Sequence, residues 1–556
     1  MPTDPDRPDG ERRTGPSAPP GMSRGPYEFG YRRSRDQDAA APVRHPVVVV
    51  GAGPVGLALA IDLALRGQRV VLLDDAARIG EGSRAICFAK RTLEIFDRLG
   101  VAAPMLEKGV TWKLGRVFHR DDELFSFDLL PETGHAMPAF INLQQYYVER
   151  FLVERVGTLP SIDLRWSNRV TAIEPRTDGV GLLVDTPEGP YRLETDWLVA
   201  CDGANSKLRG MVGAAFVGEV FEDRFLIADV KMHAAFPTER WFWFDPPFHA
   251  GQSALLHRQP DDVWRIDLQL GWEADPAEER KPERVVPRIV KMLGHDDFSL
   301  EWVSVYTFQC RRMERFVHGR VLFAGDAAHQ VSPFGARGAN SGIQDAENLA
   351  WKLALVLAGE APPSLVATYD LERSAAADEN IGHSTRSTDF IAPRSAMEHR
   401  LRDGVLALAR RHPFARGMIN SGRLSSPSAY APPLCESPLV VADREPFAGS
   451  ARLGGPLPDA AIARPDGSRG FLLGSLGDGI SVIHVPNGAR PNAVEGADLV
   501  VVGDTILDPE GQVAARLDAT PGATYVVRPD HHLAARMRHF DRARVAEAIR
   551  RIRTGG

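Results

Sequence analysis

The chain has 556 residues, and its 66 basic and 73 acidic side chains give a mild formal net charge of −7. This length allows two or three domains with a substantial core, and the charge predicts no nucleic-acid partner. No uninterrupted apolar stretch is long enough to span a membrane. The four cysteines form no C-x-x-C pair, which argues against a disulfide framework or a metal site and favours a reducing, cytoplasmic location.

The first 44 residues differ in composition from the rest of the chain. They are rich in Pro, Gly, Arg and Asp and poor in aliphatic residues, so they predict a disordered tail over residues 1–44. Arg12 and Arg13 do not predict an export signal, because no apolar segment follows them. The sequence leaves open whether Met1 or Met22 is the true start.

A dinucleotide-binding pattern follows the tail. It begins with a β-branched strand (47–50) and a G-x-G-x-x-G turn (51–56) that contains Gly51, Gly53 and Gly56. A helix (57–66), a second apolar strand (70–73) and the acid Asp74 follow. The glycine turn alone is a weak signal, but here every neighbouring element is present. Asp74 lies 23 residues after Gly51, where an acid binds a free ribose 2′-hydroxyl, so the nucleotide is expected to be FAD or NAD and not NADP.

A second acidic turn follows an apolar strand that begins at Trp197. Asp202 and Gly203 end this strand, and Ser206 and Arg209 come after them at helical spacing. Taken alone, the pattern is equally typical of an Asx turn.

Residues 221–309 have the alternation of an antiparallel sheet. Residues 224–230 and 263–270 predict strands, and an aromatic run, Trp241 to Phe244, lies between them. Such a sheet can supply an aromatic-lined pocket, although most of these aromatic side chains are expected in the domain core. Arg265 fits either a substrate carboxylate or a surface ion pair.

The segment from Gly319 to Leu355 is the most informative stretch. An apolar run, 321–324, breaks at Gly325-Asp326, a Pro/Gly-rich loop covers 333–342, and an amphipathic helix is predicted from Ile343. An acid after a strand accepts hydrogen bonds from hydroxyl groups, and a glycine loop entering a helix favours a negatively charged ligand. The alternative is an ordinary strand–turn–helix corner.

The C-terminal part of the chain is predicted to form two further units. Residues 376–435 predict basic linking helices with a solvated charged face. Residues 480–483, 499–502 and 523–527 predict strands, and a basic helix follows them at the end of the chain.

Together, the three motifs resemble the group A FAD-dependent aromatic hydroxylases, the para-hydroxybenzoate hydroxylase superfamily. The likeness is closest to the 3-(3-hydroxyphenyl)propionate hydroxylase type and is strong over residues 45 to about 375. It implies an α/β fold with a Rossmann-type FAD-binding domain (45–220 and 310–375), an inserted mixed-sheet substrate domain (221–309), linking helices (376–435) and a thioredoxin-like C-terminal domain (436–556). The last of these lacks paired cysteines, so a structural role or a homodimer interface remains for it.

The resemblance also assigns cofactor contacts. It implies that the three glycines hold the FAD pyrophosphate, that Asp74 binds the adenosine ribose, and that Arg84 contacts the phosphate side. Gln145 is expected near the ribityl chain, and Asp202 with Gly203 is expected to serve both FAD and a transient pyridine nucleotide. The flavin end of the site is expected to comprise Gly325 and Asp326 on the ribityl hydroxyls, and Pro333, Gly338, Ala339 and Asn340 against the ring.

The function implied is a monooxygenase that hydroxylates a small aromatic substrate with NAD(P)H and O2 through a flavin C4a-hydroperoxide. No second G-x-G-x-x-G occurs, so NAD(P)H is expected to bind only briefly. The proton acceptor stays open among His249, Tyr306 and His329, with Pro333 beside the reacting ring. The alternatives are an FAD-dependent halogenase, a flavin dehydrogenase without oxygen insertion, and a non-catalytic FAD-binding scaffold.

Overall fold

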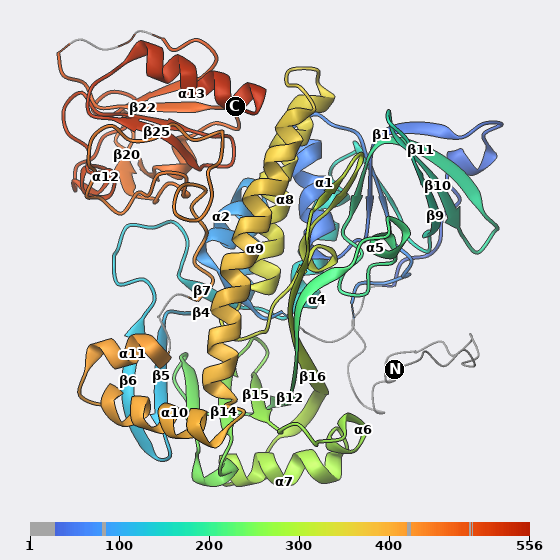
Figure 1. Ribbon diagram of the computed structural model, residues 1–556, viewed down its shortest axis with the longest axis vertical. Helices are drawn as coiled ribbons and strands as arrows, with labels where there is room; N and C mark the ends of the chain where they lie inside the picture. Colours follow the sequence, from blue (N-terminus) through green and yellow to red (C-terminus); the bar gives the residue numbers. More distant parts are fainter. Residues whose placement is uncertain (1–27, 81–84, 420–423, 489–490, 492) are drawn as a thin grey trace.

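The computed structural model describes residues 28–80, 85–419, 424–488, 491 and 493–556, with the backbone alone at 221–223 and 308. It contains a mixed sheet with the three motifs, an antiparallel sheet, and a smaller C-terminal unit, joined by two long helices (Figure 1). This mixed α/β architecture agrees with the expected fold class. Among the helices of these residues, none has the length and apolar character needed to cross a membrane.

The motif sheet has eight strands and a parallel centre. Six of them follow the order β17-β18-β11-β1-β2-β8, and β10 and β9 extend from β11. Their bounds are β1 (Val43–Val50), β2 (Val70–Leu73), β8 (Ile162–Arg165), β9 (Arg169–Pro175), β10 (Val180–Asp185), β11 (Tyr191–Ala200), β17 (Val317–His318) and β18 (Val321–Phe323). Val50 pairs with Ala200 and Leu73, and Ala200 pairs with Phe323, so all three motifs leave the sheet at one edge.

Helices cover the motif sheet and complete its core. Helix α1 packs against α8 and α4, and α8 packs against α9, which crosses the centre of the molecule beside it (Figure 1). The helices are α1 (Pro54–Leu65), α2 (Lys90–Arg98), α3 (Ala102–Lys108), α4 (Gln145–Val156), α5 (Lys207–Met211), α8 (Gly338–Leu357) and α9 (Ser364–Ile391). The strands and helices share one apolar core, which fixes the loops at the sheet edge.

The second large sheet also has eight strands, in the order β19-β16-β12-β15-β14-β13-β5-β6. It is called the antiparallel sheet here, because all its neighbouring strands are antiparallel except β13 and β5. They are β5 (Leu114–His119), β6 (Asp122–Asp128), β12 (Phe216–Lys231), β13 (Arg240–Phe244), β14 (Ser253–Arg258), β15 (Val263–Gln269), β16 (Ser299–Met313) and β19 (His329–Gln330). Helix α7 (Pro282–Leu293) covers one face through Val285 and Ile289, and the short α6 (Pro276–Glu279) precedes it. Strands β5 and β6 therefore join this sheet from outside the predicted 221–309 segment.

A three-stranded sheet lies between the two large sheets. Its order is β3-β7-β4, with β3 (Cys87–Ala89), β4 (Val110–Trp112) and β7 (Phe140–Asn142). Asn142 Nδ2 donates to the carbonyl of Arg258 at 2.7 Å, and the rings of Trp112 and His257 lie 6.4 Å apart. The face of the antiparallel sheet opposite α7 is thus turned to the motif-bearing part of the chain.

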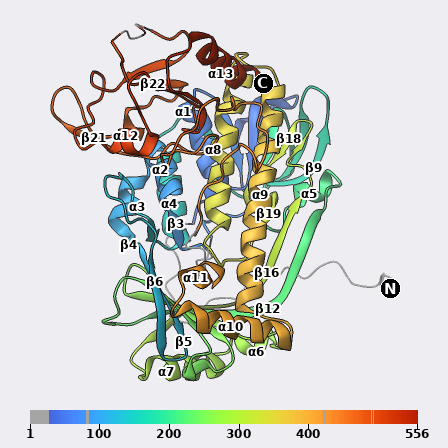
Figure 2. The ribbon, with the colours of Figure 1, turned by 60° about the vertical axis from the view of Figure 1, so that its left-hand side comes forward.

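The C-terminal unit contains a four-stranded sheet in the order β23-β22-β24-β25. Strands β22 and β23 pair in parallel, whereas β24 and β25 are antiparallel to their neighbours. Its elements are β20 (Ala461–Ala463), β21 (Arg469–Phe471), β22 (Ser481–His484), β23 (Asp498–Val501), α12 (Gln512–Leu517), β24 (Thr524–Val527), β25 (Leu533–Met537) and α13 (Arg542–Thr554). Helices α10 (Ala396–Ala409) and α11 (Pro413–Ile419) precede this unit in the chain and pack beside β5 and β6 (Figure 2).

Residues 28–44 make defined contacts, although their composition predicts disorder. Phe29 stacks on Trp166 with ring centroids 4.7 Å apart, and Arg165 donates to Asp36 at 2.6 Å. Asp36 lies in a 3-10 helix, Arg35–Asp38, directly before β1. The prediction differs from the structure because a few aromatic and charged side chains hold residues 28–44 against the rest of the chain. These few residues have little weight in the average composition of residues 1–44. Residues 1–27 lie outside the described residues.

Candidate cofactor and substrate site

The three glycines of the first motif have different physical reasons for being glycine. Gly51 has φ +107°, and a Cβ there would lie 2.3 Å from the carbonyl oxygen of Cys201. A Cβ on Gly56 would lie 1.9 Å from the carbonyl oxygen of Gly51. A Cβ on Gly53 would meet nothing within 4 Å. Gly51 and Gly56 are therefore required by packing, whereas Gly53 leaves the start of α1 open to a pyrophosphate.

Asp74 is fixed by backbone groups at the end of β2. Its Oδ2 accepts from the amide of Ala52 at 2.6 Å, and its Oδ1 accepts from the amide of Ala76 at 2.8 Å. Burial raises the pKa of this carboxyl, and the two amides oppose that shift. Each carboxylate oxygen keeps a second lone pair, which can accept from a ribose hydroxyl.

The second and third motifs are joined by Arg209. Its guanidinium donates to the carbonyl oxygens of Ala327 and Ala204 at 3.0 and 3.1 Å. Asp202 Oδ2 accepts from the amides of Lys207 and Leu208, while its buried Oδ1 has no partner among the described residues. The exposed Asp326 lies in the 3-10 turn that Arg209 contacts. The two acids therefore belong to one site at the sheet edge.

The glycine loop is tied to β3 by Asn340. Its Oδ1 accepts from the amide of Ala89 at 2.9 Å, and its Nδ2 donates to the carbonyl of Cys87 at 2.9 Å and to that of Ala336 at 2.6 Å. Helix α8 begins at Gly338, five residues earlier than the sequence predicts. Gly338, Ala339 and Asn340 thus form its first turn, whose amides point out of the helix and suit a negatively charged ligand.

Below this turn lies a buried charged network centred on Asp345. Asp345 Oδ2 accepts from the amide of Gly325 at 2.9 Å and lies 2.6 Å from His329 Nε2, while its Oδ1 accepts from Arg373 at 2.5 Å. Burial opposes the ionised form, but His329 and Arg373 outweigh it and lower the pKa of Asp345. The network fixes the position of Gly325 and therefore of the turn that carries Asp326.

The three candidate proton acceptors fall in different places. His329 is 1% exposed and held by Asp345, an arrangement that suits a structural role. His249 lies in a short 3-10 helix that contacts α7, and its Nε2 is 2.6 Å from the carbonyl of Gln269. Tyr306 lies on β16 opposite Phe225, on the face turned away from α7.

The remaining predicted contacts are only partly brought together. The exposed Pro333 precedes Phe334, whose buried ring packs edge-on against Phe225 at 4.9 Å. Gln145 Oε1 accepts from the amide of Ala85 at 3.1 Å, next to Arg84. Arg84 itself lies outside the described residues.

The sequence analysis named Arg265 but missed the row of polar side chains on the antiparallel sheet to which it belongs. Alternation along β15 turns Arg265, Asp267 and Gln269 away from α7. Pairing places Asp229 and His257 opposite Arg265, and Arg240 lies beside His257 on β13. Arg265 is 3% exposed and donates to both oxygens of Asp229 at 2.8 and 2.9 Å, so it forms a buried pair and not a surface ion pair.

Three polar atoms of this row have no partner among the described residues. They are Oδ1 of Asp267, Nη1 of Arg240 and Nδ1 of His257, all buried. Burial raises the pKa of Asp267 to about 6 and lowers the pKa of Arg240 and His257. Buried polar atoms are costly to leave unpaired, so they mark a surface prepared for a ligand. The signal in the sequence was the alternation of polar residues in β15.

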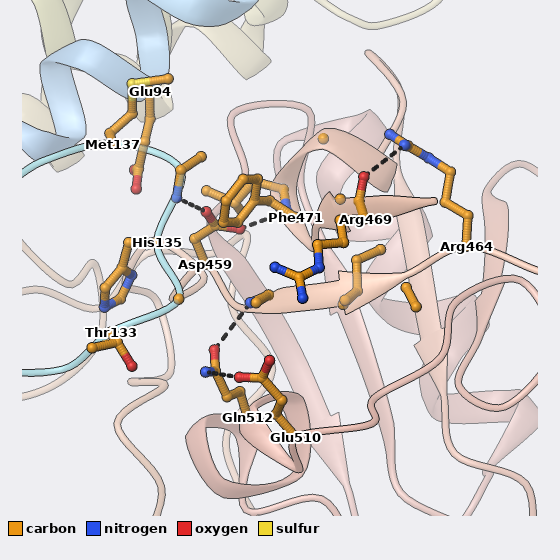
Figure 3. A pocket seen from close by; sticks show the side chains of 18 of the residues that line it. Glu94, Thr133, His135, Met137, Asp459, Arg464, Arg469, Phe471, Glu510 and Gln512 are labelled. Carbon is orange, nitrogen blue, oxygen red and sulfur yellow. Dashed lines mark hydrogen bonds between the residues drawn. The ribbon is translucent and has the colours of Figure 1, made fainter. Parts of the chain in front are cut away.

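A separate cavity lies between α2, the loop 133–137 and the C-terminal unit (Figure 3). Its volume is about 890 Å³, and Asp459, Phe471 and Gln512 line it from the C-terminal side. None of the described motif residues lines it. This cavity is therefore separate from the cofactor site.

The part of the chain that carries the three motifs matches a known protein family. The family described as "FAD binding domain" matches residues 44–384, which include all three motifs. The chain belongs to this family. Its cofactor is FAD, and the open position at Gly53, the acids Asp74 and Asp202 and the first turn of α8 suit the parts of that molecule.

Two curated relatives and one solved structure illustrate the likeness. The 12-dehydrotetracycline 5-monooxygenase/anhydrotetracycline 6-monooxygenase of Streptomyces rimosus is 32% identical over 425 residues, covering 72% of this chain and 82% of that protein. A 3-(3-hydroxy-phenyl)propionate/3-hydroxycinnamic acid hydroxylase of Mycobacterium sp. (strain KMS) is 28% identical over 469 residues, covering 84% and 79%. The flavin-dependent monooxygenase PieE, in complex with FAD and substrate, shares the fold at a TM-score of 0.76 and 24% identity, covering 92% and 99%. The predicted resemblance to group A flavin hydroxylases is confirmed.

Proposed function

We propose that the protein is an FAD-dependent monooxygenase that hydroxylates a phenolic substrate with NAD(P)H and O2. The observation that carries this proposal is the polar row on the antiparallel sheet, where buried atoms of Asp267, Arg240 and His257 have no partner among the described residues. When bound, FAD supplies the oxygen transfer. The relatives named above act on aromatic molecules, and one of them is named for a hydroxyphenyl compound.

The geometry supports the following roles for the chain's own residues. The glycines and Asp74 hold the nucleotide end, and Asp202 and Asp326 hold hydroxyl-bearing parts at the sheet edge. The first turn of α8, kept in place by Asn340, favours negative charge near the ring. The antiparallel sheet binds the substrate and excludes water from it.

The finer domain assignments are part of the same proposal. The C-terminal strand order, with one parallel and two antiparallel pairs, supports a thioredoxin-like unit. Its role is structural or a homodimer interface, because residues 436–556 contain no cysteine. A cytoplasmic location is supported by four free cysteines.

A phenol panel tests the function. The purified yellow protein is given NADH or NADPH with each phenol, in buffer without halide, and O2 uptake and product mass are followed. A gain of one oxygen coupled to NAD(P)H oxidation is expected. Stimulated NAD(P)H oxidation without an oxygenated product would favour a dehydrogenase, a product formed only after halide is added would favour a halogenase, and no substrate-stimulated flavin reduction would favour a scaffold.

A further inference from the structure

We propose that Asp267 accepts the proton of the substrate's phenolic hydroxyl and that Arg240 binds the oxygen from which the proton leaves. This inference rests on the proposed function, because it takes the substrate to be a phenol. It assigns the proton acceptor that the sequence analysis left open, and it assigns it to a residue outside the three candidates.

The first support is where the two groups lie. The ring of Trp112 on β4 lies 6.4 Å from that of His257, which is opposite Arg265 in the sheet. The charges of Arg240, Arg265 and Asp267 also act on the pKa of the Cys87 thiol on β3, which burial raises. The carbonyl of Cys87 accepts from Asn340 in the first turn of α8, and its thiol donates to Asn142 at 3.1 Å. Asp267 and Arg240 therefore face the same short strand that the flavin-side turn contacts.

The second support is that both groups are available. Among the described residues, no hydrogen bond or ion pair joins Asp267 to Arg240 or to Arg265. Arg265 is instead committed to Asp229, which also accepts from Gln259 at 2.9 Å. The half-buried Asp267 on β15 and Arg240 on β13 are thus free to contact one ligand from the two sides of β14, which lies between their strands.

The third support is electrostatic. Burial raises the pKa of Asp267; Asp229 adds to this rise, while Arg265 and Arg240 oppose it, and the result is about 6. A base with a pKa near neutrality is well matched to proton transfer at physiological pH. Asp267 is then ionised at neutral pH, yet holds a proton more readily than an ordinary carboxylate.

Other groups that face Asp267 are less suited. Burial raises the pKa of the Cys87 thiol to about 11, so it stays protonated. Burial lowers the pKa of His257 well below its usual range, which leaves a weakly basic neutral imidazole. Asp229 is held by Arg265. Among the described charged groups of this face, Asp267 is therefore the available base.

The step balances without a further reactant. The O–H bond of the phenol breaks, its proton moves to Oδ1 of Asp267, and the bonding electron pair stays on the oxygen. The guanidinium of Arg240 stabilises the resulting phenolate. The negative charge raises electron density at the ortho and para carbons, where an electrophilic oxygen is added. The proton returns to solvent or product at the end of the cycle.

The test uses the FAD-loaded enzyme and Asp267→Asn, Asp267→Glu and Arg240→Met. The probes are resorcinol, 3-(3-hydroxyphenyl)propionate, anhydrotetracycline and 4-nitrophenol. Binding is measured by difference spectra without NAD(P)H, and turnover by product mass across the pH range. With probes whose phenolic hydroxyl is un-ionised in solution, wild-type kcat/KM should rise with pH through about 6, and Asp267→Asn should lose on the order of 100-fold together with this dependence.

The remaining variants sharpen the expectation. Asp267→Glu should recover part of the rate, and Arg240→Met should raise KM and weaken the bound phenolate spectrum. For 4-nitrophenol at mildly alkaline pH, already ionised in solution, Asp267→Asn should lose little. Asp128→Asn, an exposed acid on β6 of the same sheet, is the matched control and should behave like the wild type.

The outcomes separate the two proposals. An Asp267→Asn enzyme that keeps the wild-type rate and pH dependence with neutral phenols overturns the inference and leaves the function intact. An equal loss with ionised and neutral phenols also overturns it, because the role would then be structural. Phenol binding without oxygen insertion overturns the function alone, and no binding of any probe overturns both.

Discussion

The raised pKa of Asp267 carries a prediction about stability that needs no substrate. An acid whose pKa is raised from 3.8 to about 6 in the folded state keeps its proton in a pH window where the unfolded chain has lost it. The contribution of this group to the free energy of unfolding is therefore full below about pH 4, and it decreases as the pH rises to about 6. Each pKa unit corresponds to about 1.4 kcal/mol, so the ionised group costs about 3 kcal/mol of folding free energy at neutral pH.

Asparagine resembles the protonated acid and cannot ionise. Asp267→Asn should consequently be more stable than the wild type by about 3 kcal/mol at pH 7, and this difference should vanish near pH 4. The measurement is urea denaturation of both proteins over this pH range, followed by tryptophan fluorescence. The control Asp128→Asn should instead be less stable than the wild type at pH 7. Burial raises the pKa of Asp128, but Lys113 outweighs this effect and lowers it. A variant that is less stable at pH 7, or a difference independent of pH, would refute the reasoning.

Three further predictions concern the cofactor site and the C-terminal unit. Gly53→Ala should leave the unfolding temperature of the FAD-free protein unchanged but weaken FAD binding in a fluorescence titration, whereas Gly56→Ala should lower that temperature outright. Asp345→Asn breaks a buried charged network and should cost about 3–5 kcal/mol in denaturant unfolding, with a visible change in the bound flavin spectrum. Arg528→Met leaves Glu372 without the two guanidinium donors that lie 2.6 and 3.0 Å away, and it should cost about as much. Retained stability in either charge variant would contradict its prediction.

The motif edge could be predicted because its signals are local. A glycine with positive φ, an acid after a strand and an apolar helix each leave a pattern within a few residues, as at Gly51 and Asp74. The start of α8 was predicted too late, since its first turn contains a glycine and an asparagine that are poor helix formers. The side-chain contacts of Asn340 with β3 compensate for this, and they join residues more than 250 positions apart.

The substrate side could not be placed, because its signals are not local. Strand β15 alternates in the sequence, but an antiparallel strand with one polar face is normally solvated on that face. Here that side of the sheet meets distant parts of the chain: the ring of Trp112 on β4 lies 6.4 Å from that of His257, and β5 pairs in parallel with β13. No pattern within 221–309 contains that pairing, so Arg265 remained ambiguous between a substrate contact and a surface ion pair.

The pairing of Arg265 with Asp229 also explains how Asp267 keeps its raised pKa. Asp229 repels the charge of Asp267 directly, and it engages the guanidinium that would otherwise lower that pKa further. Asp229→Asn removes both effects, so the pKa of Asp267 should fall and the acid limb of the pH–rate profile should move to lower pH. A stability measurement tests the same effect. When Asp267→Asn is made in the Asp229→Asn background, its pH-dependent gain in the free energy of unfolding should be smaller than in the wild type. If the acid limb of the pH–rate profile stays in place or moves to higher pH, Asp229 does not set the basicity of Asp267. The polar row then acts only as a binding surface.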